Sequence, residues 1–209
     1  NLHNGHLSLI ELAKRHSDRV IVSVFVNPLQ FSEDEDFDTY PRTLESDLQL
    51  AESVGADIVF CPLKDQLNTE SISTQVYVPD LGKIHCGVSR PHFFQGVCSI
   101  VLRLFNIVQP NVAVFGEKDF QQLTIIRRMV SDLFFPVDIL SGPIVREKNG
   151  LAMSSRNRYL SDFQKQQASF IFEMLNKGIA QFEAGETDAF TLIQHMTAYL
   201  QESAKEITI

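Results

Sequence analysis

Two histidines lie three residues apart near the start of the chain, in His3-Asn4-Gly5-His6, where a loop is expected to enter a helix. The first turn of a helix leaves backbone N–H groups unpaired, and together with the helix dipole they favour a bound anion. Gly5 would let phosphate oxygens approach the backbone closely. The pattern therefore predicts a phosphate site. The alternatives are two surface histidines, or a zinc site for which no further ligands occur at a recognisable spacing.

A second candidate segment, Gly116-Glu117-Lys118-Asp119, directly follows a short apolar run and opens an expected helix. In an open parallel sheet the carboxyl ends of the strands form the edge where ligands bind. Lys118 could meet a phosphate there as a point charge. The alternative is an ordinary helix start, with Asp119 as its cap and Lys118 solvated.

A third segment, Met153-Ser154-Ser155-Arg156, lies in a polar loop. Two hydroxyls, their backbone N–H groups and a guanidinium offer several hydrogen-bond donors to a polyphosphate within four residues. A polar loop without a ligand remains the alternative.

Three amide side chains are expected near the same edge of the sheet: Asn27, Gln30 and Gln122. A buried amide can hydrogen-bond a hydroxyl and a carboxylate of one substrate, which orients the substrate without adding charge. Surface glutamines are the alternative interpretation.

The elements that must position these residues alternate between helix and strand. Periodic apolar residues predict the helices, and unbroken β-branched runs are typical of strands buried in a parallel sheet.

Two stretches are expected to lack regular structure. The acidic run 33–38 lacks the glycine and the distal glutamate of a calcium loop and is expected to be solvated. Residues 62–91 are expected to be mostly loop. The predicted order is a helix from about residue 5, strand 20–26, helix 43–54, strand 56–60, short strand 74–78, helix 95–108, strand 112–115, helix 119–132, strand 136–140 and an extended piece at 143–147.

This alternation predicts an α/β fold with a right-handed, doubly wound parallel sheet. From residue 162 the pattern changes to two helices, 162–183 and 188–205, and a strand is expected to begin at 206–209. We expect a first domain at 1–150 and the start of a smaller second domain at 151–209, with the sequence cut short at both ends.

Composition narrows the classes of function. The chain has 209 residues, with 18 Lys and Arg against 26 Asp and Glu, and a formal charge of −8. This acidity argues against a broad contact with nucleic acid or an anionic membrane, but it permits a local phosphate site. No run approaches the roughly 18 apolar residues that span a bilayer. Three cysteines without a CxxC spacing argue against a disulfide framework or a thiolate zinc site and favour a reducing cytoplasm.

Six segments, taken in order, closely resemble the pantoate–β-alanine ligases, or pantothenate synthetases, of the nucleotidylyltransferase superfamily. The resemblance covers nearly the whole chain. The segments are HNGH (3–6), FVNPLQF (25–31), YPRTLESDL (40–48), SRPHFFQGV (89–97), LFNIVQPNVAVFGEKDFQQL (104–123) and VREKNGLAMSSRNRYLS (145–161).

The resemblance implies a Rossmann-like domain of the HxGH nucleotidylyltransferase type, followed by a smaller α+β domain. It implies an enzyme that joins D-pantoate to β-alanine at the expense of ATP, through a pantoyl adenylate, and releases AMP and pyrophosphate. Mg²⁺ accompanies ATP in this family. The resemblance further implies a homodimer, and the composition already predicts a cytoplasmic protein that binds neither nucleic acid nor membrane.

The resemblance also assigns residues. It gives catalytic roles to His3, His6, Lys118 and Arg156, with His6 as proton donor, and it places Arg90 near the phosphate end. Gln30 and Gln122 match the pantoate-binding glutamines, and Gln30 also matches the β-alanine site. The implied ATP-binding set is His3, Asn4, Gly5, His6, Gly116, Glu117, Lys118, Asp119, Val145, Met153, Ser154, Ser155 and Arg156.

Some features depart from the family pattern. The strand and the Pro-Thr-Met-Gly segment that precede HxGH in the family are absent, and His92 stands one position early, so it receives no role. The metal ligands are not identified, and Asp47 is only a weak candidate. HxGH alone would also fit another nucleotidylyltransferase, which would not need the paired Gln30 and Gln122, or a module that binds ATP without turnover.

Overall fold

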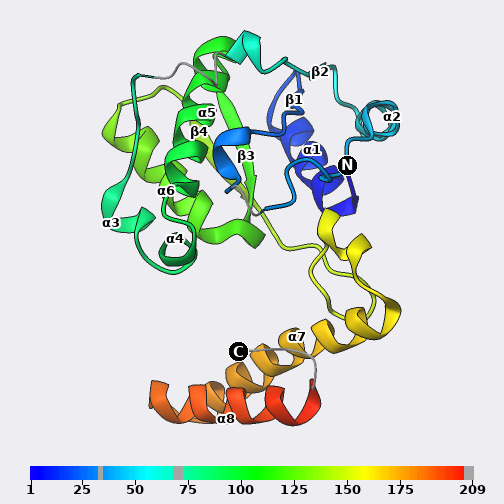
Figure 1. Ribbon diagram of the computed structural model, residues 1–209, viewed down its shortest axis with the longest axis vertical. Helices are drawn as coiled ribbons and strands as arrows, with labels where there is room; N and C mark the ends of the chain where they lie inside the picture. Colours follow the sequence, from blue (N-terminus) through cyan, green and yellow to red (C-terminus); the bar gives the residue numbers. More distant parts are fainter. Residues whose placement is uncertain (33–34, 68–72, 205–209) are drawn as a thin grey trace. The chain divides into compact units, whose positions relative to one another are not determined.

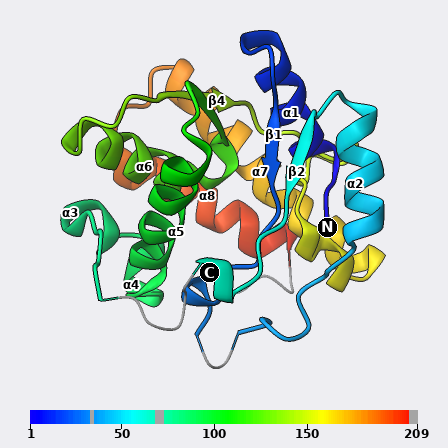
Figure 2. The same ribbon diagram turned by 90° about the horizontal axis from the view of Figure 1, so that it is seen from above.

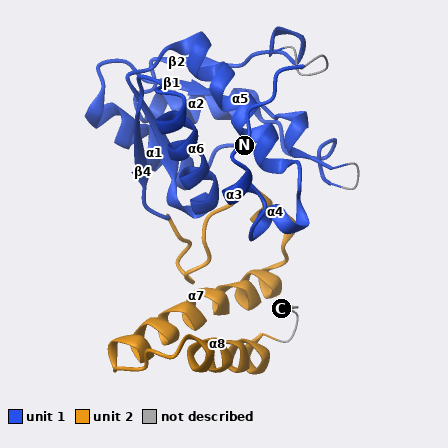
Figure 3. Cartoon of the chain, turned by 90° about the vertical axis from the view of Figure 1, so that its left-hand side faces the viewer, with its two compact units in different colours: residues 1–144 blue, residues 145–209 orange. Residues whose placement is uncertain are grey.

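The computed structural model describes residues 1–32, 35–67 and 73–204, which form two compact units, Asn1–Ile144 and Val145–Ile209 (Figure 3). The first unit alternates helices and strands along the chain (Figure 1). Its elements are α1 (Asn4–His16), β1 (Ile21–Ser23), η1 (Pro28–Gln30), α2 (Leu44–Ser53), β2 (Ile58–Phe60), η2 (Asp65–Leu67), α3 (Pro79–Gly82), α4 (Cys86–Ser89), α5 (Phe93–Val108), β3 (Val112–Gly116), η3 (Glu117–Asp119), α6 (Phe120–Asp132) and β4 (Asp138–Gly142).

The strands are parallel, which confirms the predicted α/β class. Ile21 pairs with Ile58 at the start of β1 and β2, and Val112 pairs with Asp138 at the start of β3 and β4. Figure 2 shows β1 and β2 side by side. Within the described ranges these are two separate two-stranded ladders, whereas the sequence predicted one continuous sheet.

Helix α1 packs against both strand pairs. Ile10, on one side of the helix, is buried in a cluster with Val20 and Ala51. Leu9, on another side, lies against Gly116 and Gly142, the last residues of β3 and β4. A Cβ at Gly142 would overlap the end of the Leu9 side chain, so glycine at that strand end lets Leu9 pack closely against it.

The main core of the first unit lies between α5, α6 and the β3–β4 pair. Its buried residues are Phe94, Val97, Cys98, Phe105, Ile125, Ile126, Met129 and Val137. Helix α5 also packs on η1, and this contact is close because Gly96 has no side chain. A Cβ at Gly96 would overlap the carbonyl group of Leu29, at 2.7 Å from its carbon.

Two of the predicted extended pieces are wrong. Residues 74–78 form no strand, although Val76 and Val78 pack against the main core. The β-branched residues there are used for packing, and no neighbouring strand within the described ranges offers a ladder. The piece at 143–147 has a single bridge, between Arg146 and Ala152. The predicted loop at 62–91 contains three short helical turns, η2, α3 and α4.

The second unit contains η4 (Ser155–Tyr159) and a helical hairpin of α7 (Asp162–Glu183) and α8 (Ala189–Ser203). Ser161 and Gln164 form the capping box that begins α7. Gly185 has a φ of +106°, which suits glycine in the turn between the helices. The strand predicted at 206–209 lies outside the described residues. In the described part of the chain, each helix is too short or too polar to cross a membrane.

The contact between Gly96 and η1 predicts whether a substitution at Gly96 raises or lowers the free energy of unfolding. A helical Gly→Ala change normally stabilises a protein by up to about 1 kcal/mol. Gly96→Ala should instead lower the free energy of unfolding by about 2 kcal/mol, because the new methyl group meets backbone. Gly178→Ala in α7 is the matched control, since its methyl group meets only the flexible side chain of Met196. Chemical denaturation measures both, and a stabilised Gly96→Ala protein would refute the close contact.

Candidate active site

The HNGH segment folds as predicted, with His3 at the N-cap of α1 and His6 in its first turn. The two imidazole rings stack with centroids 3.9 Å apart and planes inclined by 30°. The backbone N–H of His3 donates to Nδ1 of His6 at 3.3 Å. Because Nδ1 accepts this bond, the proton of a neutral His6 is on Nε2, which leaves Nε2–H as a donor.

Burial favours the uncharged form of both histidines. Burial, and next the charge of Lys118, lowers the pKa of His3. Burial, and next the neighbouring His3, lowers the pKa of His6 from 6.5 to about 4. The charge of Lys118 also contributes to the lowered pKa of both rings, and the strand end that precedes Lys118 packs on the same helix. His3 Nδ1 is buried with no hydrogen-bond partner in the described part of the chain.

The GEKD segment begins at the end of β3 and continues as η3 into α6. Gly116 ends the strand beneath Leu9 of α1, so this segment is fixed beside the helix that carries the histidines. Lys118 Nζ lies 3.7 Å from Asp119 Oδ1, and both side chains are exposed. Asp119 stands at the N-cap position of α6 but makes no capping hydrogen bond with its side chain. The alternative role of Asp119 as a side-chain cap is therefore not observed.

Gln30 and Gln122 come from two elements that both pack on α5. Gln30 is the last residue of η1, and Gln122 lies in the first turn of α6. Both are half-buried. The third candidate amide, Asn27, has a structural role instead, because its Oδ1 accepts from Leu29 N–H at 3.2 Å and its Nδ2 donates to Gly96 O at 3.1 Å. Asn27 is 2% exposed.

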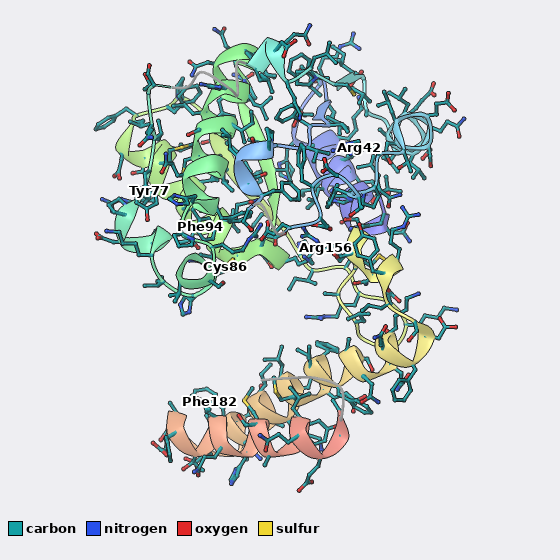
Figure 4. All side chains as sticks on the ribbon, in the orientation of Figure 1. Arg42, Tyr77, Cys86, Phe94, Arg156 and Phe182 are labelled. Atoms are coloured by element: carbon teal, nitrogen blue, oxygen red, sulfur yellow. The ribbon has the colours of Figure 1, made fainter. Side chains whose placement is uncertain are left out.

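In the second unit the structure places Met153-Ser154-Ser155-Arg156 at the start of η4. Ser154 caps this turn, and its hydroxyl oxygen accepts from Arg156 N–H at 3.2 Å. The side chain of Asn157 holds the loop by donating to Glu147 Oε1 at 2.8 Å and to Ala152 O at 3.0 Å. Arg156 is exposed (Figure 4).

Val145 and Met153, which both belong to the ATP-binding set implied by the resemblance, are neighbours in the second unit. Met153 N–H donates to Val145 O at 2.9 Å, which closes a loop whose tip is the turn at Gly150. Gly150 has a φ of +90°, and its N–H donates to Glu147 O at 2.9 Å. The hydrogen-bonded loop therefore puts Val145 and Met153 on adjacent backbone, as a shared binding surface requires.

Sequence reasoning did not foresee that three side chains, Asp47, Gln121 and Arg90, hold the segments around these residues. Asp47, which is 2% exposed, accepts hydrogen bonds from Leu2 N–H at 2.7 Å and from the Thr43 hydroxyl at 3.2 Å, next to the HNGH segment. Gln121 donates to Leu81 O and Ile84 O and accepts from Cys86 N–H, joining α3, α4 and α6. The third is Arg90. No local sequence signal distinguishes a glutamine or arginine of this kind from a surface residue.

A resident metal ion is normally held by several side-chain ligands gathered at one place. No group of three or more His, Cys, Asp or Glu in the described ranges could hold a metal ion. The oxygen of Asp47 that accepts from Leu2 and Thr43 is already engaged in hydrogen bonds, which does not fit the weak metal role considered for this residue.

The lowered pKa of His6 makes stability depend on pH. His6 binds a proton near pH 6.5 in the unfolded chain but only near pH 4 in the folded chain. The contribution of the neutral His6 ring to the free energy of unfolding is therefore fully present above pH 6.5, and it is lost as the pH falls from 6.5 toward 4. The stability of wild type relative to His6→Gln should therefore drop by about 2 kcal/mol between about pH 7.5 and about pH 5. Urea denaturation measures this change. A pH-independent difference, or an NMR midpoint near 6.5 for His6, would contradict the account.

Comparison with known proteins gives one consistent result. The family model for pantoate-beta-alanine ligase matches residues 1–208. Pantothenate synthetase of Hahella chejuensis is 50% identical over 190 residues, which cover 90% of this chain and 67% of the relative. The Aquifex aeolicus relative is 49% identical over 200 residues, covering 96% of this chain and 71% of that protein.

Solved structures agree with the sequence relatives. Pantothenate synthetase from Thermus thermophilus superposes with a TM-score of 0.92 at 43% identity, covering 96% of this chain and 73% of that one. Pantoate-beta-alanine ligase from Francisella tularensis, complexed with beta-gamma ATP and beta-alanine, gives a TM-score of 0.81 at 35% identity, covering 95% and 74%. With its motifs, its parallel strands and these matches taken together, the chain belongs to the pantoate-beta-alanine ligase family.

Proposed function

We propose that this protein condenses D-pantoate with β-alanine through a pantoyl adenylate, using ATP and releasing AMP and pyrophosphate. The observation that carries the proposal is the pair of stacked, partly buried histidines at the N-terminus of α1, where burial favours the uncharged rings and the charge of Lys118 also lowers their pKa. In a chain of this family, such a cluster of uncharged donors and one cation suits a polyphosphate.

In the first step, a pantoate carboxylate oxygen attacks the α-phosphorus of ATP. A P–O bond forms to the carboxylate, and the bond from the α-phosphorus to the bridging oxygen of pyrophosphate breaks. Negative charge grows on the α-phosphoryl oxygens and on the leaving group, so preorganised donors stabilise the transition state. Nε2–H of His6 and the ammonium group of Lys118 are such donors in the first unit.

In the second step, the amine of β-alanine attacks the acyl carbon of the adenylate. The new C–N bond replaces the acyl C–O bond, AMP departs with the oxygen that bridged the two groups, and the amine loses a proton. This step needs orientation more than charge. We assign Gln30 and Gln122 to bind pantoate, and Gln30 also to bind β-alanine, because an amide can donate and accept at once.

The nucleotide contacts are assigned by the family motifs on the positions described above. We propose catalytic roles for His3, His6, Lys118 and Arg156. Val145 and Met153, joined by a backbone hydrogen bond, would line the adenine side. The rest of the proposed ATP set is Asn4, Gly5, Gly116, Glu117, Asp119, Ser154 and Ser155. We propose that residues 1–150 form the ATP- and pantoate-binding domain and that residues 151–209 belong to a second domain.

The remaining features of the protein are further parts of this proposal. Mg²⁺ enters with the phosphates of ATP as part of the substrate. The protein acts as a homodimer in the cytoplasm. Cys61, Cys86 and Cys98 are all unpaired, which supports a reducing compartment.

Isotope exchange tests the proposed chemistry. The intact protein should exchange labelled pyrophosphate into ATP when pantoate is present, and it should not need β-alanine, because adenylate formation is reversible before the amine arrives. Exchange that is equally fast without pantoate would indicate another nucleotidylyl transfer. No exchange under either condition would indicate nucleotide binding without turnover.

Replacing Lys118 tests the assignment of the main cation in the first unit. Lys118→Ala should slow adenylate formation at least about a hundredfold, since one preorganised donor contributes roughly 3 kcal/mol to the transition state. Single-turnover release of pyrophosphate measures this rate. The control is Lys83→Ala, at an exposed lysine after α3, which should change the rate less than about twofold. A loss of tenfold or less in Lys118→Ala would mean that another group is the key cation.

A further inference from the structure

Arg90 makes a dense set of contacts outside the phosphate-binding segments. Its Nε lies 2.7 Å from Glu35 Oε1, and its Nη2 lies 2.7 Å from Glu35 Oε2, so the pair is bidentate. Nη2 also donates to the backbone carbonyl of Gln30 at 2.7 Å. The guanidinium carbon lies 3.8 Å from the centroid of the Phe93 ring. About three quarters of each charged side chain is buried, at 26% and 24% exposure.

These contacts fix one end of the turn that carries Gln30. The other end is held by Asn27, whose side chain bonds Leu29 N–H and Gly96 O. Within the turn, Gln30 N–H donates to Asn27 O and Phe31 N–H donates to Pro28 O. Arg90 bonds the carbonyl of Gln30 itself, so both ends of η1 are anchored by side chains.

The chemistry of Arg90 suits an anchor better than a binding site for a substrate anion. Its planar fork is directed at the Glu35 carboxylate, which already neutralises the positive charge. Stacking on Phe93 fixes the plane of the guanidinium and hence the direction of the bond to Gln30. A lysine could supply the charge, but neither the bidentate pair nor the stacking.

We infer that Arg90 is a positioning residue: held by Glu35 and Phe93, it fixes the backbone of Gln30 and thereby sets the affinity for the substrates that Gln30 binds. The inference rests on the proposed function for the identity of those substrates. A displacement of about 1 Å in a positioning group can cost up to a hundredfold in rate or binding, so a single anchor can have a measurable effect.

Steady-state kinetics of four variants of the intact protein test this inference. Arg90→Lys should raise KM for pantoate roughly tenfold and leave KM for ATP within about twofold, because the nucleotide segments are not touched. Glu35→Gln should raise the pantoate KM in the same direction, by about threefold, because it loosens the guanidinium. The double variant should be no worse than Arg90→Lys alone, since the two side chains act through one contact.

Arg42→Lys is the matched control. Arg42 also donates to backbone carbonyls, those of Phe37 and Asp38, and its guanidinium lies over the Phe37 ring, but it does not contact Gln30. It should leave the pantoate KM unchanged. If Arg90 instead binds the substrate carboxylate directly, Glu35→Gln would leave the pantoate KM unchanged or lower it, and the inference would be overturned. Equal changes in every KM, together with lost stability, would also overturn it.

A second readout does not depend on activity. Amide hydrogen exchange at Gln30 and Phe31 should be about tenfold faster in Arg90→Lys than in wild type, and unchanged in Arg42→Lys. Unchanged exchange in Arg90→Lys would overturn the inference. A wild-type protein without pantoate-dependent turnover would refute the proposed function, while this exchange measurement would still test the role of Arg90.

Discussion

The candidate site depends on the contact of helix α1 with the ends of β3 and β4. Leu9 lies against Gly116 and Gly142, and glycine at the second position leaves room for it. Because Gly116 is also the first residue of GEKD, the same contact fixes this segment beside helix α1. One packing contact thus brings two motifs together that are more than a hundred residues apart in the sequence. The lowered pKa values of His3 and His6 follow from this arrangement, since both burial and the charge of Lys118 contribute to them.

A chain with a formal charge of −8 must concentrate its donors in order to hold a polyanion. In the first unit, the proposed donors are one cation, Lys118, and two imidazole rings whose burial favours the uncharged form. Neutral histidines add donors without mutual repulsion, and the bond from His3 N–H to His6 Nδ1 fixes the tautomer of His6. Preorganised donors of this kind cost little reorganisation when charge develops on a ligand.

The local features of the site could be predicted from the sequence. HNGH, GEKD and MSSR each lie at a helical start, and the helices and paired strands occur close to their predicted positions, because periodicity and capping are local signals.

Strand pairing and contacts between residues far apart in the sequence could not be predicted. Residues 74–78 have a strand-like sequence, but they pack on the core without a ladder partner, and the four strands form two ladders within the described ranges. Likewise, Asn27 resembles a substrate amide in sequence, and only its buried bond to Gly96 shows the structural role. Glu35 belongs to a run expected to be solvated, yet it forms a pair with Arg90 in which about three quarters of each side chain is buried.

The central claim is that the carboxylate of pantoate is activated by transfer of AMP. Pantoate labelled with ¹⁸O in its carboxylate tests this directly, with mass spectrometry of the products after a complete reaction in the intact protein. The acyl adenylate route leaves the bridging oxygen on phosphorus when the amine attacks carbon, so the account predicts one labelled oxygen in AMP for each pantothenate formed. AMP without label, with ¹⁸O in inorganic phosphate or pyrophosphate, would contradict the account.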